Sequence, residues 1–553
     1  MRLDKIRMAG LGVIAIGALA ITGCAAGGSS DGGGADASGV VTTNGTEPQN
    51  PLIPTNTTEV GGGKIIDSLF AGLVSYDADG AIEMEVAESI EPNDDNTVWT
   101  VTLADGWTFT NDEAVTAQSF VDAWNYGAYG PNAQGSSYFF DNIVGYADVQ
   151  GELDEEGNVT TEPAAETMSG LEVVSDTEFT VSLSAPEADF PLRLGYSAYS
   201  PLPEVAFDDI DAFGENPVGN GPYMLDGEGA WQHDVRIDLV TNPDYSGVRE
   251  PQNDGLGITF YAQADGAYND LLADNLDIID LIPSSAFQTY EDELEGRAVN
   301  QAAAIFQSFT IPQYLEHFEP GEEGDLRREA ISLAVDRESI IDAIFAGTRT
   351  PARDFTSPVI DGYSEDLEGS DVLDYDVERA ADLWAQADAI SPYEGTFEIA
   401  YNTDGDHEAW VTAATNSIAN ALDISAQGKP YATFAELLDD EANDVMTGAF
   451  RSGWQADYPS MYNFLAPLYQ TGAGSNYGRY TSEEFDGLLV EGQQASSVDE
   501  ATAIYQEAQE VLLEDLPVVP LWYSNVNGGW STAVDNVEFG WNQVPLFHEV
   551  TKG

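Results

Sequence analysis

The chain of 553 residues is poor in cysteine and histidine, two residues that often carry nucleophilic or metal chemistry. Cys24 is its only cysteine, which excludes a disulfide within the chain and leaves no cysteine nucleophile after it. The sequence also lacks the Gly-x-Ser-x-Gly and His-Glu-x-x-His motifs of common hydrolases. These absences leave an enzyme unsupported, and we expect no catalytic residue, metal or other cofactor.

The nearest approach to a metal-binding group is His407-Glu408 beside Asp404 and Asp406. Because the chain holds 97 Asp and Glu residues, acidic neighbours of a histidine arise by chance. For the same reason, a pair of neighbouring carboxylates in this sequence is not evidence for a glycosidase.

Cations are scarce as well, with 18 Lys and Arg against the 97 acids and a formal net charge of −79. This balance excludes general nucleic-acid binding, which needs a basic surface. The charge has two interpretations, a preference for cationic ligands or simple solubility outside a cell in a salty or acidic habitat. Composition alone favours the second interpretation, solubility outside a cell.

The first 24 residues read as an export signal with an anchor. Arg2, Lys5 and Arg7 precede the apolar run Met8–Ile21, which is shorter than the roughly 20 residues of a membrane span. The run ends in Ile-Thr-Gly-Cys, which resembles the bacterial lipobox, so we expect lipidation of Cys24 after removal of residues 1–23. Residues 24–39, rich in Gly and Ser, would be the anchor and a flexible tether.

The rest of the chain alternates strand and helix patterns and is too long for one core. We expect a helix and strand over Gly61–Tyr76, and a hairpin that pairs Thr97–Leu103 with Trp107–Phe109. Further helices are expected after Thr116, from Asp325 to Gly347, after Asp376 and after Ser497, with a buried strand at Pro517–Tyr523. The mixture predicts an α/β or α+β protein of more than one lobe.

One aromatic segment stands out as a candidate binding site. Asp457 lies among Trp454, Tyr458, Tyr462 and Phe464, and Arg451 is the nearby cation. A carboxylate walled by aromatic rings attracts an ammonium group strongly, and an arginine can hold a carboxylate, so the segment suits a zwitterion. The alternative is that the aromatic residues are core and Asp457 caps a turn.

Six segments in order resemble the extracellular solute-binding protein family 5, the peptide-binding lipoproteins of ABC importers. They are Thr97–Thr116 (TVWTVTLADGWTFTNDEAVT), Asn216–Tyr223 (NPVGNGPY), Asn242–Tyr245 (NPDY), Leu326–Arg337 (LRREAISLAVDR), Tyr375–Ala381 (YDVERAA) and Gly453–Pro459 (GWQADYP). The resemblance implies an α/β, two-lobed, periplasmic-binding-protein-like fold of type II, cluster C, with an extra third domain. Lobe I would comprise 40–76, 202–298 and 525–553, the extra domain 77–201, and lobe II 299–524.

The resemblance also implies roles for the Gly453–Pro459 region. Asp457 matches an aspartate that pairs with the amino terminus of a peptide, and Trp454 flanks the ligand. Arg451 has the spacing of an arginine that meets a short peptide's carboxylate, and Gly453 and Tyr458 complete the expected ligand-binding set. The partners would be a peptide and the subunits of a membrane permease, with the protein a monomer held on the outer face of the cell membrane through Cys24.

Two other functions stay open at this point. Other branches of the family bind oligosaccharides, nickel or haem, and a sugar receptor would use the aromatic residues without needing Asp457. Nickel is disfavoured because the chain has no histidine cluster. An exported hydrolase is the third hypothesis.

Overall fold

A computed structural model describes residues 39–153, 159–403, 405 and 407–553. The expected signal peptide, Cys24 and nearly all of the tether therefore lie outside the described residues, as do Asp404 and Asp406. Within the described part, none of the helices combines the length and apolar character that a membrane crossing requires.

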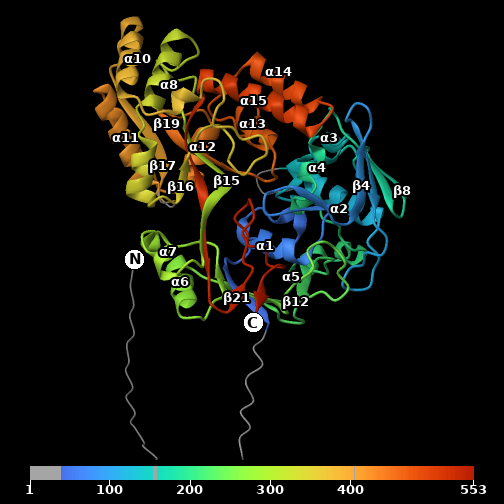
Figure 1. The fold of residues 1–553 in the computed structure, drawn as a ribbon. Coiled ribbons are helices and arrows are strands. Elements are labelled where there is room, and N and C mark those ends of the chain that lie inside the picture. The colour runs from blue at the N-terminus through green and yellow to red at the C-terminus, as the bar shows by residue number, and fades with distance from the viewer. Residues whose placement is uncertain (1–38, 154–158, 404, 406) are drawn as a thin grey trace, which may run out of the picture. The chain divides into compact units, whose positions relative to one another are not determined.

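The largest feature is one mixed sheet in the order β10-β12-β13-β1-β14-β20-β15-β19-β17-β18, with β11 beside β12 and β16 beside β20. Near one end, β1 (Val40–Gly45) runs parallel to β13 (Gly255–Phe260) and β14 (Ile278–Ile279). The remaining strands there are β10 (Tyr223–Leu225), β11 (Trp231–Gln232) and β12 (Arg236–Thr241). With helices α1 (Val60–Leu69), α6 (Ala264–Leu272) and α7 (Tyr290–Glu293) they form the lower half in Figure 1.

The upper half contains the other end of the sheet. Strands β17 (Thr396–Asn402), β18 (Ser425–Tyr431) and β19 (Ala449–Gln455) form it, and β16 (Arg349–Pro351) pairs with β20. Its helices are α8 (Glu322–Leu333), α10 (Val377–Ile390), α11 (Glu408–Leu422), α12 (Phe434–Ala442), α13 (Met461–Tyr469), α14 (Glu483–Gln493) and α15 (Val498–Asp515) (Figure 1). Alternation along β17 places Ile399 in the core shared with α11 and Ala400 in a separate cluster with Leu437 of α12, so helices cover both faces.

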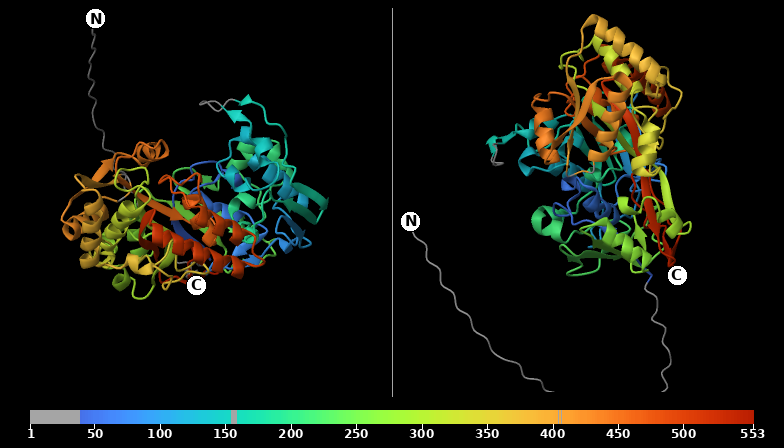
Figure 2. Two further views of the ribbon diagram at one scale, coloured as in Figure 1. Left: turned by 90° about the horizontal axis from the view of Figure 1, so that it is seen from above. Right: turned by 90° about the vertical axis from the view of Figure 1, so that its left-hand side faces the viewer.

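Two long antiparallel strands connect the halves. β15 (Ala298–Thr310) and β20 (Val518–Trp530) pair from Ala298 opposite Gly529 to Thr310 opposite Val518. The register is irregular between Ala302 and Phe306, midway along the pair. The red strand β20 runs from the helices of the upper half down to the lower half in Figure 1 and in the right-hand view of Figure 2. The chain thus crosses between the halves along these strands.

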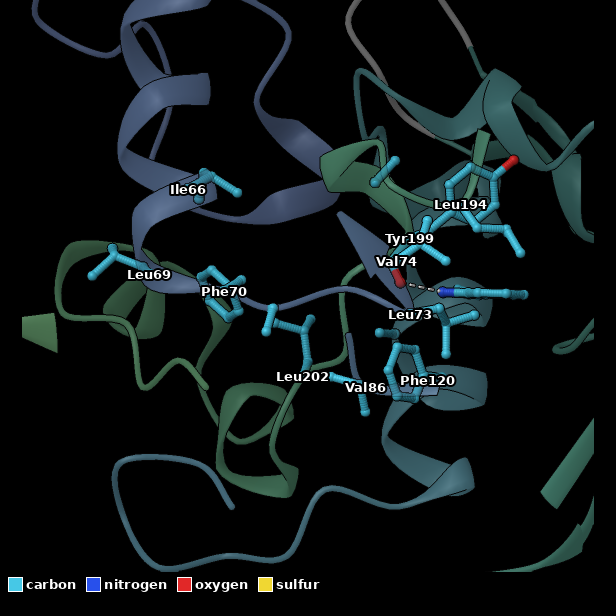
Figure 3. Close-up of a cluster of buried hydrophobic side chains, with 14 of the residues drawn as sticks. Ile66, Leu69, Phe70, Leu73, Val74, Val86, Phe120, Leu194, Tyr199 and Leu202 are labelled. Carbon is cyan, nitrogen blue, oxygen red and sulfur yellow. Dashed lines mark hydrogen bonds between the residues drawn. The ribbon is translucent and has the colours of Figure 1, made fainter. Parts of the chain in front are cut away.

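A side unit is built on a second sheet in the order β4-β5-β9-β8. Its strands are β4 (Ala87–Pro92), β5 (Val98–Leu103), β8 (Leu171–Ser175) and β9 (Glu178–Ser182), and α2 (Ala117–Ala128) packs on them. Trp124 of α2 donates from Nε1 to the carbonyl of Tyr199 at 2.9 Å. Figure 3 shows how Phe120, Tyr199 and Leu194 of this unit lie beside Leu73 and Val74. The side unit and the lower half share one continuous core.

Several local predictions are confirmed. α1 and β2 (Val74–Tyr76) fall within Gly61–Tyr76 apart from the first residue of α1, and β2 forms a hairpin with β3 (Ile82–Met84). The N-caps of α2, α10 and α15 are the expected Thr116, Asp376 and Ser497. The buried strand at Pro517–Tyr523 exists and extends farther, as β20.

The predicted hairpin between Thr97–Leu103 and Trp107–Phe109 is wrong. β5 is an interior strand whose two edges are already paired with β4 and β9. After Gly106 the chain instead folds on itself, with the amide of Val115 donating to the carbonyl of Trp107 at 2.9 Å. An alternating pattern shows that a strand is half buried, but it does not select the pairing partner.

The single helix predicted from Asp325 to Gly347 is also wrong. α8 ends at Leu333, α9 spans Arg337–Ile340, and a π-helical turn covers Ile341–Phe345. The break accommodates the buried guanidinium of Arg337, which donates to the carbonyls of Pro520 at 2.8 Å and Leu373 at 2.7 Å. Helical periodicity continues across the break and therefore conceals it.

The remaining short elements connect these parts. They are α3 (Tyr146–Gln150), α4 (Phe190–Arg193), α5 (Ile210–Glu215), the pair β6 (Glu152–Leu153) and β7 (Val159–Thr161), and the pair β21 (Val534–Asp535) and β22 (Thr551–Lys552).

Candidate ligand-binding site

A cavity of about 300 Å³ receives wall residues from both halves. α1 and the β2–β3 hairpin contribute Lys64, Asp67 and Tyr76 from below, and the end of β19 with the residues that follow it contributes Gln455, Ala456 and Asp457 from above. The loop that carries Trp541 and His548 closes another side. A ligand in this cavity would contact chain segments far apart in sequence.

Asp457 is held in place by one buried side chain, Asn463 of α13. The amide Nδ2 of Asn463 donates to Asp457 Oδ2 at 3.1 Å, and its Oδ1 accepts from the backbone N–H of Asp457 at 2.9 Å. The same Oδ1 accepts from Nε1 of Trp454 at 3.2 Å. Asn463 therefore fixes the carboxylate and the indole together, and it was absent from the residues predicted from sequence. A lone amide in the apolar helix MYNFLAPLY was the available signal.

Burial raises the pKa of Asp457 to about 6, against the opposing effects of the Asn463 hydrogen bond and the positive charge of Arg193. The carboxylate is thus ionised at neutral pH but lies in surroundings that disfavour its charge. An ammonium group placed beside it would relieve that cost, because attraction between charges is stronger where water is partly excluded.

Aromatic rings surround the carboxylate. The charge of Asp457 contributes, after burial, to raising the pKa of Tyr138 and of Tyr196, which places both phenols near it. Phe139 stacks on Tyr196 with ring centroids 4.1 Å apart. Tyr76 meets Trp541 edge to face at 5.5 Å, and both line the cavity. The side unit therefore supplies part of the wall around Asp457.

Tyr458 lies on the other side of the segment, away from the cavity. Its hydroxyl accepts from Arg193 Nη2 at 3.3 Å, and the Arg193 guanidinium lies 5.3 Å from the centre of its ring. Arg193 also pairs with Glu187 at 2.8 Å, and Ser460 donates to Asp189 at 2.5 Å. These contacts join the Asp457 segment to the side unit, so in this structure Tyr458 is an interface residue.

Arg451 and Gly453 are not in the cavity wall. Arg451 Nε donates to Asn402 Oδ1 at 2.8 Å, and its guanidinium lies 4.2 Å from the ring centre of Phe434. Arg451 lies within β19, whereas Asp457 follows the end of that strand at Gln455. Gly453 is exposed on the same strand. Trp454 is joined to Asp457 through Asn463, but of the five predicted ligand-binding residues only Asp457 lines the cavity.

Metal ligands do not gather among the described residues, where no group of three or more His, Cys, Asp or Glu side chains could hold an ion. His407 accepts at Nδ1 from Trp410 Nε1 at 3.0 Å, and its predicted neighbours Asp404 and Asp406 lie outside the described residues. In the cavity wall, burial lowers the pKa of His548 to about 4, so this histidine is neutral at neutral pH.

The fold is that of the two-lobed solute-binding proteins. The structure of MppA, a murein tripeptide binding protein in its unliganded open form, has a TM-score of 0.77 at 20% identity, covering 93% of this chain and 97% of that one. The complex of Haemophilus influenzae OppA with RPPGFSPFR has a TM-score of 0.71 at 22% identity, covering 94% and 99%. The predicted two-lobed α/β fold class is confirmed.

Sequence comparison gives the family. Residues 81–476 match the bacterial extracellular solute-binding proteins, family 5, and the chain belongs to this family. It is 26% identical to the oligopeptide-binding protein OppA of Escherichia coli over 501 residues, which covers 88% of this chain and 87% of OppA. It is also 26% identical to the probable deoxycholate-binding protein YgiS of Escherichia coli, covering 85% of each, and 24% identical to the dipeptide-binding protein DppE of Bacillus subtilis, covering 83% and 82%.

Proposed function

We propose that this protein captures peptides outside the cell and delivers them to the permease of an ABC importer, without catalysing a reaction. The observation that carries the proposal is Asp457, an oriented and partly buried carboxylate in the wall of a cavity between the halves. Relatives named for binding oligopeptides and dipeptides support the same substrate class.

Asp457 would pair with the amino terminus of the peptide. Every peptide with a free amino terminus carries this group, so one fixed carboxylate serves ligands of many sequences. Trp454 would flank the ligand, and Asn463 would keep both groups in place. A ligand with a carboxylate and no amine, such as deoxycholate, would gain nothing from Asp457.

The division into lobes that the sequence predicts is part of the proposal: lobe I from 40–76, 202–298 and 525–553, the extra domain 77–201, and lobe II 299–524. The two ends of lobe II, Val299 and Ser524, lie in β15 and β20. The core shared by the side unit and the lower half favours their moving together against the upper half. Closure around a peptide would then be a rotation about the two long strands.

Lipid attachment at Cys24 is a second part of the proposal, with the mature protein a monomer on the outer face of the membrane. It rests on the lipobox-like sequence alone. Cys24→Ala should abolish incorporation of labelled palmitate and shift the protein to the soluble fraction, or leave the precursor uncleaved. An unchanged lipid-labelled band would contradict the assignment.

Native mass spectrometry tests the substrate class directly. The protein, unfolded and refolded to remove bound ligand, is mixed with equal amounts of defined tri- to pentapeptides and of linear oligosaccharides. We expect complexes with peptides only. Complexes with sugars and none with peptides would favour the oligosaccharide receptor, and release of cleaved peptides would favour the hydrolase.

A further inference from the structure

The wall of the cavity is markedly acidic. Four carboxylates line it, those of Glu59, Asp67, Asp77 and Asp457. Among the described residues of the wall, the only Lys or Arg side chains are Lys64 and Arg249. The balance of charge available to a ligand depends on whether these two cations are already engaged.

Lys64 is engaged by a carboxylate behind the wall. Its ammonium group is buried, forms an ion pair with Asp280, and lies 3.4 Å from the carbonyl oxygen of Asn44. Asp280 does not line the cavity, and its second oxygen accepts from the amide of Asn44 at 2.7 Å. The charge of Lys64 is therefore neutralised from outside the cavity.

Arg249 is engaged more completely. Its Nε and Nη2 donate to Glu85 at 2.9 and 3.2 Å, and Nη2 also donates to the carbonyl of Phe70 at 2.9 Å. Its Nη1 donates to the carbonyl of Asp67 at 2.8 Å and lies 3.1 Å from the Asp67 carboxylate. The Glu85 side chain is fully buried and does not line the cavity. Four of the five N–H groups of Arg249 therefore donate within the protein, and its charge is balanced by the buried Glu85 carboxylate.

Asp67 is the carboxylate most open to a ligand at the end of the cavity where Arg249 and His548 lie. Its side chain is 66% exposed, and its one ion pair is with Arg249, which Glu85 already neutralises. Asp77, by contrast, uses Oδ1 to accept from the amides of Asp79 and Ala81 in the hairpin turn. Glu59 uses both oxygens to cap α1 at Gly62.

Two further features point to a polar, cationic occupant. Ser75 is 7% exposed and lies in the cavity wall, and its hydroxyl has no hydrogen-bond partner among the described residues. The rings of Tyr76, Tyr196 and Trp541 also line the cavity, and aromatic faces attract ammonium and guanidinium groups.

We infer that the cavity selects peptides carrying a lysine or arginine side chain, and that Asp67 is the group that meets this second positive charge. The inference rests on the proposed function, in which Asp457 holds the amino terminus. A glutamate or aspartate at the same position of the peptide would meet four carboxylates and two cations that are each already paired with a carboxylate.

The test uses alanine pentapeptides with one substitution at the second, third or fourth residue. The substituted residue is lysine, Nε-acetyl-lysine, which keeps the stem and loses the charge, or glutamate. Calorimetry should show, at one position or more, lysine binding at least about tenfold tighter than glutamate and about threefold tighter than acetyl-lysine. Raising the salt concentration should reduce both ratios.

The variant Asp67→Asn tests whether the preference for lysine comes from Asp67. Asparagine keeps the contact between the backbone carbonyl of residue 67 and Arg249, and it leaves Arg249 paired with Glu85. Asp67→Asn should bring the ratio of lysine to acetyl-lysine affinity close to one. Glu394→Gln, which alters an exposed carboxylate outside the wall, is the matched control and should keep the ratio.

If peptides bind tightly but the affinities of the lysine and glutamate peptides agree within twofold at every position, the inference is overturned and the proposed function stands. A ratio that survives Asp67→Asn and disappears in Asp77→Asn would overturn the assignment to Asp67. Failure of every peptide to bind would refute the proposed function, and the inference with it.

Discussion

Replacing Asp457 by asparagine separates the charge of this side chain from its shape. Asparagine retains an oxygen that can accept from Asn463 Nδ2, so the local structure should persist. The peptide amino terminus, however, loses its ionic partner. We therefore expect opposite effects on peptide binding and on the stability of the unliganded protein.

The size of the effect on stability follows from the pKa of Asp457. Burial raises it from 3.8 to about 6, and at about 1.4 kcal/mol per unit the ionised group costs the folded protein roughly 3 kcal/mol at neutral pH. Because the folded pKa is the higher one, the group stabilises the fold below the unfolded pKa, and this contribution is lost as the pH rises through about 6. Asp457→Asn should therefore leave the unliganded protein equally or more stable at pH 7, by up to about 3 kcal/mol.

The expected effect of Asp457→Asn on peptide binding is a loss, opposite in sign to its effect on stability. Loss of one partner of a desolvated charge pair should weaken peptide binding by more than about 2 kcal/mol, or about 30-fold. Calorimetry measures the affinity and urea unfolding the stability, with Asp366→Asn at an exposed position as the control. Unchanged affinity would refute the role of Asp457, and a loss of affinity matched by a loss of stability would show a structural role instead.

Three further predictions concern the same region. Peptide affinity should be flat near pH 7 and fall about tenfold per pH unit below about 6, as Asp457 of the unliganded protein is protonated; calorimetry showing constant affinity from pH 7 to 5 would contradict this. Asn463→Ala leaves the backbone N–H of Asp457 and the indole N–H of Trp454 without their acceptor, so urea unfolding should show a loss of about 1–3 kcal/mol, and no loss would refute the bridging role. Arg193→Met strands the buried Glu187 and should cost about 3–5 kcal/mol at pH 8, whereas Arg193→Met combined with Glu187→Met should recover part of that loss; equal stability of the two variants would argue against a coupled pair.

The sequence predicted the fold class because the family's segments recur in order along most of the chain. It also predicted helix starts well, since an N-cap such as Thr116, Asp376 or Ser497 is a local signal. Strand pairing was missed where it depended on distant segments, as for β5 between β4 and β9. The break before Arg337 was missed because the guanidinium finds its acceptors on segments far along the chain.

The candidate site was predicted in part. Of the residues grouped by type and spacing, Asp457 lines the cavity, and Asn463 joins it to Trp454 behind the wall residues. Arg451 and Tyr458 were grouped with them because they are near in sequence, but Arg451 lies outside the cavity wall and donates to Asn402, and the interface with Arg193 buries Tyr458. The acidic cavity wall could not be predicted, because Asp67 and Asp77 reach it only when α1 and the β2–β3 hairpin fold against the upper half.

The central claim is that the cavity recognises the amino terminus of a peptide. Calorimetry with one pentapeptide, supplied with a free or an acetylated amino terminus, tests it most directly. We predict that acetylation weakens binding to the wild-type protein by at least about 30-fold and changes the affinity of the Asp457→Asn variant much less. Equal binding of the two peptides by the wild-type protein would contradict the account.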